Sequence, residues 1–116
     1  PENLPTVGLD DPAMDALDVL AKKHLGCFVV TDHGKLAGIF TEGDFIRALK
    51  NDTDLKRLKA RDLMNPTPKS VQASESAFYA MSLIRKFQIN QLVVVDDHNA
   101  VVGLVHIHDL VAAKIN

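Results

Sequence analysis

Hydrophobic and polar positions along the chain follow one pattern that occurs twice. In the first half, apolar residues recur at helical spacing over 13–21, and a continuous β-prone run follows over 27–31. A second strand over 36–40 and a helix from 41 to about 49 complete the unit. The same order of elements returns after residue 69. The pattern therefore predicts two β-α-β-β-α units, each beginning with a short extended entry.

The two units are copies of one sequence pattern. A shift of 64 residues superimposes their first parts, and one extra residue in the second turn raises the shift to 65. The matched pairs include Val7 with Val71, Leu20 with Ile84, Val30 with Val94, Gly38 with Gly103, Thr41 with His106, and Asp44 with Asp109. Two copies of one supersecondary unit predict a pseudo-twofold α/β domain with a cleft between the copies. Such a design suggests sensing rather than catalysis.

Local signals give the first copy its boundaries. Pro5 keeps the entry segment out of a helix. Asp11 is the expected N-cap of the first helix, and Pro12 occupies its first position. Gly26 is expected to end that helix, and the segment 32–35 to form a hairpin turn between the two strands.

The second copy repeats this plan from Ser70 onward. Ser74 is the expected helix cap, and the buried helix face is expected at Ala77, Ala80, Met81 and Ile84. The remaining elements are a strand over 91–95, a turn over 96–99, a strand over 100–105 and a helix that opens at 106–109. Neither copy can cover its own three-element sheet, so the two copies are expected to pack face to face.

The segment 51–65 is the most charged part of the chain and connects repeat 1 (1–50) with repeat 2 (66–116). It could be a basic patch for nucleic acid or a solvated, partly helical linker. The linker is favoured because acidic residues alternate with basic ones and no aromatic residues accompany them.

Composition narrows the function further. The 116 residues carry a formal charge of −2, and no basic stripe indicates nucleic-acid binding. No apolar run is long enough for a bilayer, and no signal-peptide pattern opens the chain. The single Cys27 excludes an internal disulfide framework, so a cytoplasmic location is expected. Because the chain opens without methionine, we expect it to be part of a longer protein.

The two strand-to-helix junctions carry the candidate chemistry. Thr41 or His106 ends a strand, and Asp44 or Asp109 follows three residues later at a helix start. Free backbone N–H groups there favour phosphate, and the carboxylate can accept the hydroxyls of a ribose. Threonine and aspartate also cap helices for structural reasons alone. Recurrence in both copies favours a paired binding site.

Extended entry, helix, strand, turn, strand ending in Gly-x-x-Thr-x-x-Asp and helix, all present twice, resemble a tandem pair of CBS domains (a Bateman module). The resemblance implies two nucleotide sites and a regulatory role beside an enzyme or transporter. It places Thr41 and Asp44 with Ser70, Val71, Gln91 and Leu92 in the first site, and His106, His108 and Asp109 with Thr6, Val7, Cys27 and Phe28 in the second.

A narrower resemblance concerns the C-terminal half of the arabinose 5-phosphate isomerase family. The strings that carry it are GIFTEGDF, DLMNPTPKSV and INQLVVVDDHNAVVGLVHIHDL. It implies an N-terminal sugar isomerase domain in the same protein, which makes the precursor of Kdo for lipopolysaccharide or capsule. The implied ligand is CMP-Kdo, the pathway end product, with an adenine nucleotide as the alternative. The resemblance also implies a homodimer formed through the module, and it allows a tetramer of the full-length isomerase. That family usually has Asp-Gly-Asp-Leu-Arg-Arg where this chain has Glu-Gly-Asp-Phe-Ile-Arg, one basic residue fewer.

Two groups of residues could carry metal-binding or nucleophilic chemistry, but each also has a structural interpretation. His106, His108 and Asp109 could hold a metal ion, but the first copy has no matching cluster, so an anion contact or a helix start is favoured. Cys27 could be a nucleophile, but its place in an apolar strand favours a buried packing residue. The chain offers no set of nucleophile, base and orienting group, so we expect no enzyme, metal or cofactor in it. Two alternatives stay open: a purely structural dimerisation module, and an accessory module of another enzyme or a transporter.

Overall fold

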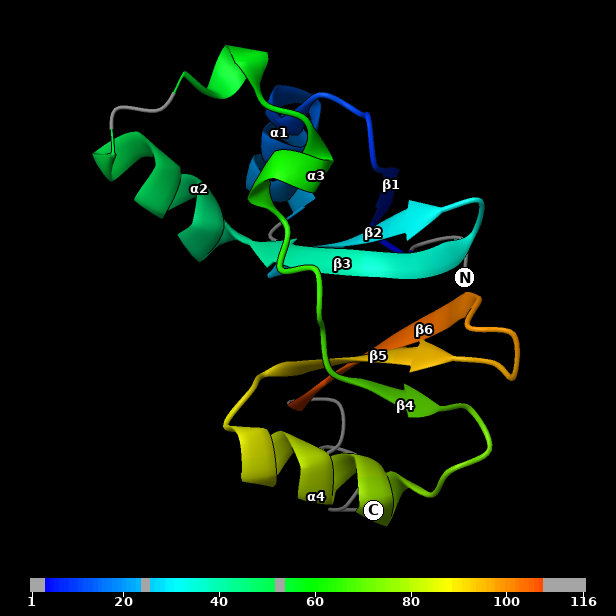
Figure 1. Cartoon of the computed structure of the whole chain (residues 1–116). Helices are drawn as coiled ribbons and strands as arrows, with labels where there is room; N and C mark the ends of the chain where they lie inside the picture. Colours follow the sequence, from blue (N-terminus) through cyan, green and yellow to red (C-terminus); the bar gives the residue numbers. More distant parts are fainter. Residues whose placement is uncertain (1–3, 24–25, 52–53, 108–116) are drawn as a thin grey trace. The chain divides into compact units, whose positions relative to one another are not determined.

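The structure is a computed structural model that describes residues 4–23, 26–51 and 54–107 (Figure 1). The chain divides into two compact units. We call Pro5–Pro68 the first unit; the second unit comprises Leu4 and the residues from Lys69 onward. Within the described part of the chain, no helix is both long and apolar enough to cross a membrane.

The first unit is built on a three-stranded sheet in the order β1-β2-β3. Strand β1 (Thr6–Gly8) runs parallel to β2 (Cys27–Asp32), and helix α1 (Ala13–Lys23) makes the crossover that parallel neighbours require. Strand β3 (Lys35–Thr41) pairs antiparallel with β2 and leads into α2 (Glu42–Lys50). The order of these elements along the chain is the one that the sequence predicts.

The turn between β2 and β3 has the backbone conformation of a tight hairpin. His33 and Gly34 have φ angles of 53° and 83°, so both central residues lie in the left-handed region. Type I′ hairpin turns require this conformation, and glycine adopts it without steric cost. The predicted turn at 32–35 is confirmed.

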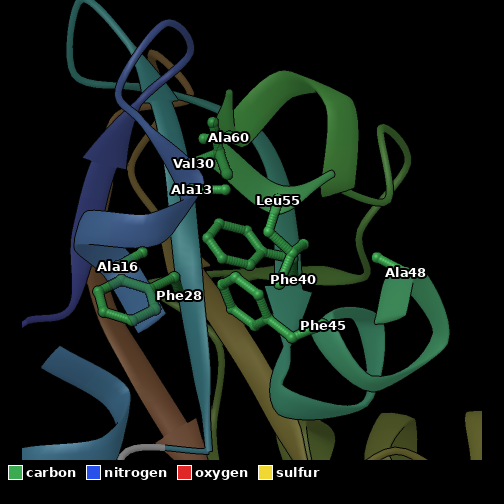
Figure 2. Close-up of a cluster of buried hydrophobic side chains, with 9 residues drawn as sticks. All are labelled: Ala13, Ala16, Phe28, Val30, Phe40, Phe45, Ala48, Leu55 and Ala60. Carbon is green, nitrogen blue, oxygen red and sulfur yellow. The ribbon is translucent and has the colours of Figure 1, made fainter. Parts of the chain in front are cut away.

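Three phenylalanine rings form the centre of the first unit's core. Phe28 and Phe40 stack with their centroids 5.6 Å apart, and Phe45 meets Phe40 edge-on at 5.4 Å. These rings come from β2, β3 and α2, so the core joins the sheet to the helix that begins at the junction. Figure 2 shows the three rings together with Leu55, which comes from the connector.

The connector is partly helical, as expected, but it is not wholly solvated, because two of its side chains belong to this core. It contains a short 3₁₀-helix, η1 (Leu55–Arg57), and one turn of α-helix, α3 (Ala60–Leu63). Leu55 and Ala60 are only 7% and 1% exposed. Figure 1 shows the connector, in green, returning over the first unit, where η1 packs on α1 and α2. Its charged residues face water while these two apolar side chains are buried, a pattern too short to recognise by periodicity.

The second unit repeats the architecture with its own sheet, β4-β5-β6. Its elements are β4 (Ser70–Gln72), α4 (Ala77–Phe87), β5 (Gln91–Val95) and β6 (Val101–His106). The register is equivalent in both sheets: Val7 pairs with Val30 as Val71 pairs with Val94. An irregularity also interrupts both hairpins at the same place, after Val30 and after Val94. The internal repeat seen in the sequence is therefore a structural repeat.

Two details of the second unit differ from the sequence prediction. The cap of α4 is Ser76, whose Oγ accepts the Tyr79 N–H at 3.1 Å, and not Ser74. The chain first makes a turn in which the Glu75 N–H bonds to the Gln72 carbonyl, which moves the helix start two residues along. Ala77 is consequently exposed, whereas Ala80 and Ile84 are buried as expected and Met81 is partly buried.

The start of α1 also differs from expectation. The helix begins at Ala13, and Pro12 forms an isolated bridge with Lys59 of the connector. The Asp11 carboxylate accepts the N–H of Gly8 at 2.8 Å. Gly8 precedes the helix in the chain, whereas an N-cap side chain accepts an N–H of the helix's first turn. The Ala13 N–H is bonded to the Leu58 carbonyl at 2.9 Å, so the connector satisfies a donor that a sequence-local cap was expected to serve.

Candidate functional site

The junction between β3 and α2 is organised around the Asp44 carboxylate. Its Oδ2 accepts the Thr41 N–H at 2.7 Å and the Thr41 hydroxyl at 3.3 Å. Its Oδ1 forms an ion pair with the Arg47 guanidinium, one turn further along α2. The carboxylate is thus held at the helix start, with its side chain 22% exposed. A carboxylate has about four acceptor positions, so three donors leave capacity for one further hydroxyl.

Arg47 also belongs to this junction, although the sequence pattern gives it no role there. Its side chain is 68% exposed and reaches back to Asp44 across three residues. An acid and a base at i and i+3 on a helix are neighbours in space, and that spacing was visible in the sequence. The Asp44 carboxylate is therefore already paired with a cation on its own helix.

The predicted residues of the first repeat gather at one end of its sheet. Thr41, the last residue of β3, pairs with Cys27, the first residue of β2. Beside them, Thr6 at the start of β1 pairs with Val29, whose N–H bonds to the Pro5 carbonyl at 2.8 Å. The strand register therefore brings the entry segment, the first-strand start and the junction of one repeat to a common edge.

The second repeat presents the corresponding edge with different chemistry. His106 ends β6 opposite Gln91, the first residue of β5, and Ser70 pairs with Val93. The Ile107 N–H bonds to the Asn90 carbonyl at 2.8 Å, which ties the end of the junction strand to the entry of β5. His106 and Gln91 are partly buried, and Ser70 is exposed. His108 and Asp109 lie outside the described residues.

Burial separates the predicted residues into two groups. Cys27, Phe28, Val71 and Leu92 are between 0% and 6% exposed, so their side chains serve the cores. The polar members of the set are exposed or only partly buried: Thr6, Thr41, Asp44, Ser70, Gln91 and His106. Val7 is also partly buried. These accessible groups are hydroxyl, carboxylate, amide and imidazole, which suit hydrogen bonding to a polar ligand.

Cys27 lacks the surroundings of a reactive thiol. It is 1% exposed, and burial raises the pKa of its thiol to about 11. Since the thiolate is the nucleophile, a raised pKa disfavours covalent chemistry at neutral pH. The interpretation of Cys27 as a packing residue agrees with this environment.

A metal site is not formed by the part of the chain that the structure describes. No group of three His, Cys, Asp or Glu side chains within residues 4–23, 26–51 and 54–107 is placed to hold an ion. The proposed partners of His106 in such a site fall beyond residue 107.

Comparison with protein families gives a match over nearly the whole chain. The model described as "CBS domain" matches residues 2–51 and 60–116. Among curated proteins, an arabinose 5-phosphate isomerase KdsD from Pseudomonas aeruginosa is 40% identical over 98% of this chain and 35% of its own length. A KdsD from Francisella tularensis is 30% identical over 97% of this chain and 34% of its own length. The chain thus spans about a third of the length of the curated relatives that it matches.

Solved structures with a similar fold include proteins bound to a nucleotide. A putative signal-transduction protein with CBS domains from Burkholderia ambifaria has a TM-score of 0.84 and 30% identity, covering 97% of this chain and 83% of its own. CBSX2 in complex with AMP has a TM-score of 0.84 and 26% identity, with coverages of 98% and 89%. The protein PAE2072 from Pyrobaculum aerophilum, also complexed with AMP, has a TM-score of 0.77 and 27% identity, with coverages of 90% and 82%.

Proposed function

Because the chain belongs to the CBS-domain family and contains the domain twice, we propose that it is a regulatory module that binds a nucleotide or nucleotide-sugar and modulates an attached arabinose 5-phosphate isomerase domain. The observation that carries this proposal is that a polar residue ends the last strand of both repeats in equivalent register. Thr41 faces Cys27 in one sheet as His106 faces Gln91 in the other. Helix capping alone does not require two such edges in register.

The proposed ligand contacts come from residues of both repeats. One set consists of Thr41 and Asp44 with Ser70, Val71, Gln91 and Leu92. The other consists of His106, His108 and Asp109 with Thr6, Val7, Cys27 and Phe28. Since several of these side chains are buried, we assign hydrogen bonding to the polar members and assign the buried ones the role of shaping and supporting the edges.

Two ligand classes follow from different observations. Two of the similar structures are AMP complexes at 26% and 27% identity, which supports an adenine nucleotide. The KdsD relatives support an isomerase parent, for which the end product CMP-Kdo would be a feedback inhibitor. Both ligands offer ribose hydroxyls to Asp44 and a phosphate to the junction N–H groups.

Regulation is proposed to act by population shift. A ligand changes the activity of an attached domain only through its different affinities for two states of the module. In this proposal the module forms a homodimer in the cytoplasm, and ligand binding favours one packing of it. The attached isomerase domains respond to that packing.

A structural dimerisation module without ligand is the second candidate function. The observation that favours it is the engagement of Asp44, which already holds the Thr41 N–H and the Arg47 guanidinium. A carboxylate used only for capping needs no ligand. The two functions differ in whether any nucleotide stabilises the folded chain.

A thermal-shift titration separates these functions. The panel is AMP, ATP, S-adenosylmethionine, CMP and CMP-Kdo, applied to the wild type and to the Asp44→Ala and Asp109→Ala variants. A ligand at about 100 times its Kd stabilises the folded state by about 2.7 kcal/mol, so the melting temperature must rise with concentration. We expect a rise with at least one nucleotide, reduced in one of the variants.

Asp54→Ala is the matched control. Asp54 accepts the Lys56 N–H at 3.1 Å at the start of η1, as Asp44 accepts the Thr41 N–H at the start of α2. Asp54 is not one of the proposed ligand contacts, so its replacement should lower the melting temperature without reducing the ligand-induced rise. No rise with any of the five compounds would reject the sensor and leave the structural module.

A further inference from the structure

The turn that follows β1 is bound to the connector along its whole length. The Arg61 N–H donates to the Leu9 carbonyl at 3.0 Å, and the Ala60 N–H donates to the Asp11 carbonyl at 2.9 Å. About fifty residues separate the two segments in the sequence, and an isolated bridge between Pro12 and Lys59 lies next to these bonds. The connector therefore holds the turn by backbone hydrogen bonds.

A charged contact strengthens this attachment at its exposed side. The Asp10 carboxylate accepts the Arg61 Nε–H at 2.9 Å, and the Arg61 Nη2 lies 2.8 Å from the same oxygen. Lys59 adds a more distant contact at 3.7 Å. Two guanidinium nitrogens on one carboxylate oxygen define a direction as well as a distance, which a single lysine contact does not.

The other end of the connector is attached to β3. Asn65 and Ile39 exchange two backbone hydrogen bonds, of 2.8 Å and 3.2 Å. Met64 lies against Gly38, where an added Cβ would approach its sulfur to 2.5 Å. The connector thus contacts the first unit at two places: the turn that follows β1, at the end of this strand opposite Thr6, and β3 at Ile39, two residues before Thr41.

We propose that Asp10 and Arg61 are positioning residues for nucleotide binding. They hold the turn after β1, and through it the entry strand with Thr6 and Val7, in the conformation that the ligand requires. This inference rests on the proposed function, because it assigns a role in nucleotide binding. Neither residue is one of the proposed ligand contacts, so they act through the backbone of the turn.

Because this ion pair is exposed to solvent, its removal is expected to change the stability of the whole chain only slightly. Asp10 and Arg61 are 64% and 48% exposed. An exposed pair contributes little to global stability because solvent screens it. The backbone bonds remain when the side chain is shortened, so the fold should persist, and the turn loses only the additional restraint that the ion pair supplies. A purely structural pair would leave nucleotide affinity unchanged.

The connector offers a matched control for the experiment. Arg57 also lies on the connector and pairs with Asp54, at 3.5 Å and with 87% exposure, but this pair does not reach the β1 turn. We would measure AMP affinity by isothermal titration for the wild type, Arg61→Ala and Arg57→Ala. Amide hydrogen exchange without ligand would be followed over residues 6–11 in the same three proteins.

Arg61→Ala is expected to weaken AMP binding by about two- to fivefold, the size of an exposed ion pair, and to speed exchange in the β1 turn. Arg57→Ala is expected to match the wild type in both measurements. The reversed pair, Asp10→Arg with Arg61→Asp, should recover part of the affinity that Arg61→Ala loses. Recovery by exchanged charges identifies the pair itself as the cause.

The outcomes separate this inference from the proposed function. If the wild type binds AMP and Arg61→Ala binds it equally well, the positioning role is wrong while the sensor stands. Equal loss in Arg61→Ala and Arg57→Ala would also overturn it, since general loss of charge would then explain the effect. If the wild type binds neither AMP nor the other compounds of the panel, the proposed function fails and the positioning role fails with it.

Discussion

Gly38 and Gly103 occupy equivalent positions in the two repeats but have different neighbours. Each lies opposite the strand residue that precedes the hairpin irregularity, Val30 in one repeat and Val94 in the other. At Gly38 an added Cβ would come within 2.5 Å of the Met64 sulfur and 2.7 Å of the Asn65 carbonyl oxygen. At Gly103 the nearest atom would be the Val94 Cβ at an ordinary 3.5 Å. The connector causes this difference, because it packs only on the first of the two positions.

Gly38→Ala is therefore expected to destabilise the chain, and Gly103→Ala to leave its stability nearly unchanged. A methyl group forced against backbone costs about 1–3 kcal/mol, whereas one in open contact changes stability by about 0.5 kcal/mol or less. Urea unfolding of the two variants measures the difference. Equal losses in both would show that the glycines serve the hairpin itself rather than the approach of the connector.

Asp96 gives the chain a local dependence on pH. Hydrogen bonds from the Ala100 and His98 N–H groups lower the pKa of its carboxyl below the ordinary 3.8. A lowered pKa in the folded state means that the carboxylate stabilises the fold above the unfolded-state pKa. That contribution disappears as the pH falls through the folded-state pKa.

Asp96→Asn should therefore be less stable than the wild type at neutral pH, with a difference that shrinks as the pH falls below about 4. Unfolding free energies measured from pH 7 to pH 2.5 test this. Asp97→Asn removes a neighbouring exposed charge from the same turn and is the control for net charge. A difference that grew at acid pH would contradict the stated sign.

At the scale of the elements, helix starts show how local signals compete. The segment Ser74-Glu75-Ser76 offers two good caps, and the sequence pattern favoured the first. The structure uses Ser76 because the Glu75 N–H closes a turn onto Gln72 before the helix begins. A turn of this kind depends on where β4 ends, which the serines do not encode.

Ser76→Ala should cost about 1 kcal/mol of stability, and Ser74→Ala close to nothing. The reason is that only the Ser76 hydroxyl accepts a helix N–H, that of Tyr79 at 3.1 Å. Thermal unfolding of the two variants is sufficient to test this, since both remove one hydroxyl from exposed positions. A larger loss of stability in Ser74→Ala than in Ser76→Ala would show that Ser74 is the N-cap, as the sequence pattern predicts.

At the scale of the whole molecule, Cys27 offers a reporter of unfolding. The thiol is 1% exposed and has a pKa raised to about 11, so it should resist thiol reagents at pH 7 in the folded chain. Labelling should occur only when the first unit opens, and its rate should rise with denaturant. A nucleotide that binds the folded state should slow labelling in proportion to its stabilisation. Rapid labelling without denaturant would contradict the burial of Cys27.

The labelling rate of Cys27 also distinguishes the two glycine substitutions. Gly38→Ala, which strains the first unit, should accelerate labelling of Cys27, while Gly103→Ala in the second unit should not. The chain divides at Pro68 and Lys69, so each unit has its own core and its own contribution to stability. Equal acceleration by both substitutions would mean that the two units unfold as one.

The sequence by itself determined the repeat, the order of the helices and strands along the chain, and the hairpin turns. These features depend on local periodicity, on turn residues such as Gly34, and on comparison of the chain with itself. The recurring junction residues suggested contacts to phosphate and ribose, and the family resemblance added the assignment of the residues to two nucleotide sites.

Only the tertiary structure decided which of these residues are accessible and what restrains them. It buried Leu55 and Ala60 of a charged connector, placed Met64 against Gly38, and paired Arg61 with Asp10. It also showed that the Arg47 guanidinium forms an ion pair with the Asp44 carboxylate. Most of these contacts join residues far apart in the chain, and even the Asp44–Arg47 pair depends on side-chain orientation. Hydrophobic pattern and spacing specify elements, but the packing between elements selects which side chains are left free to bind.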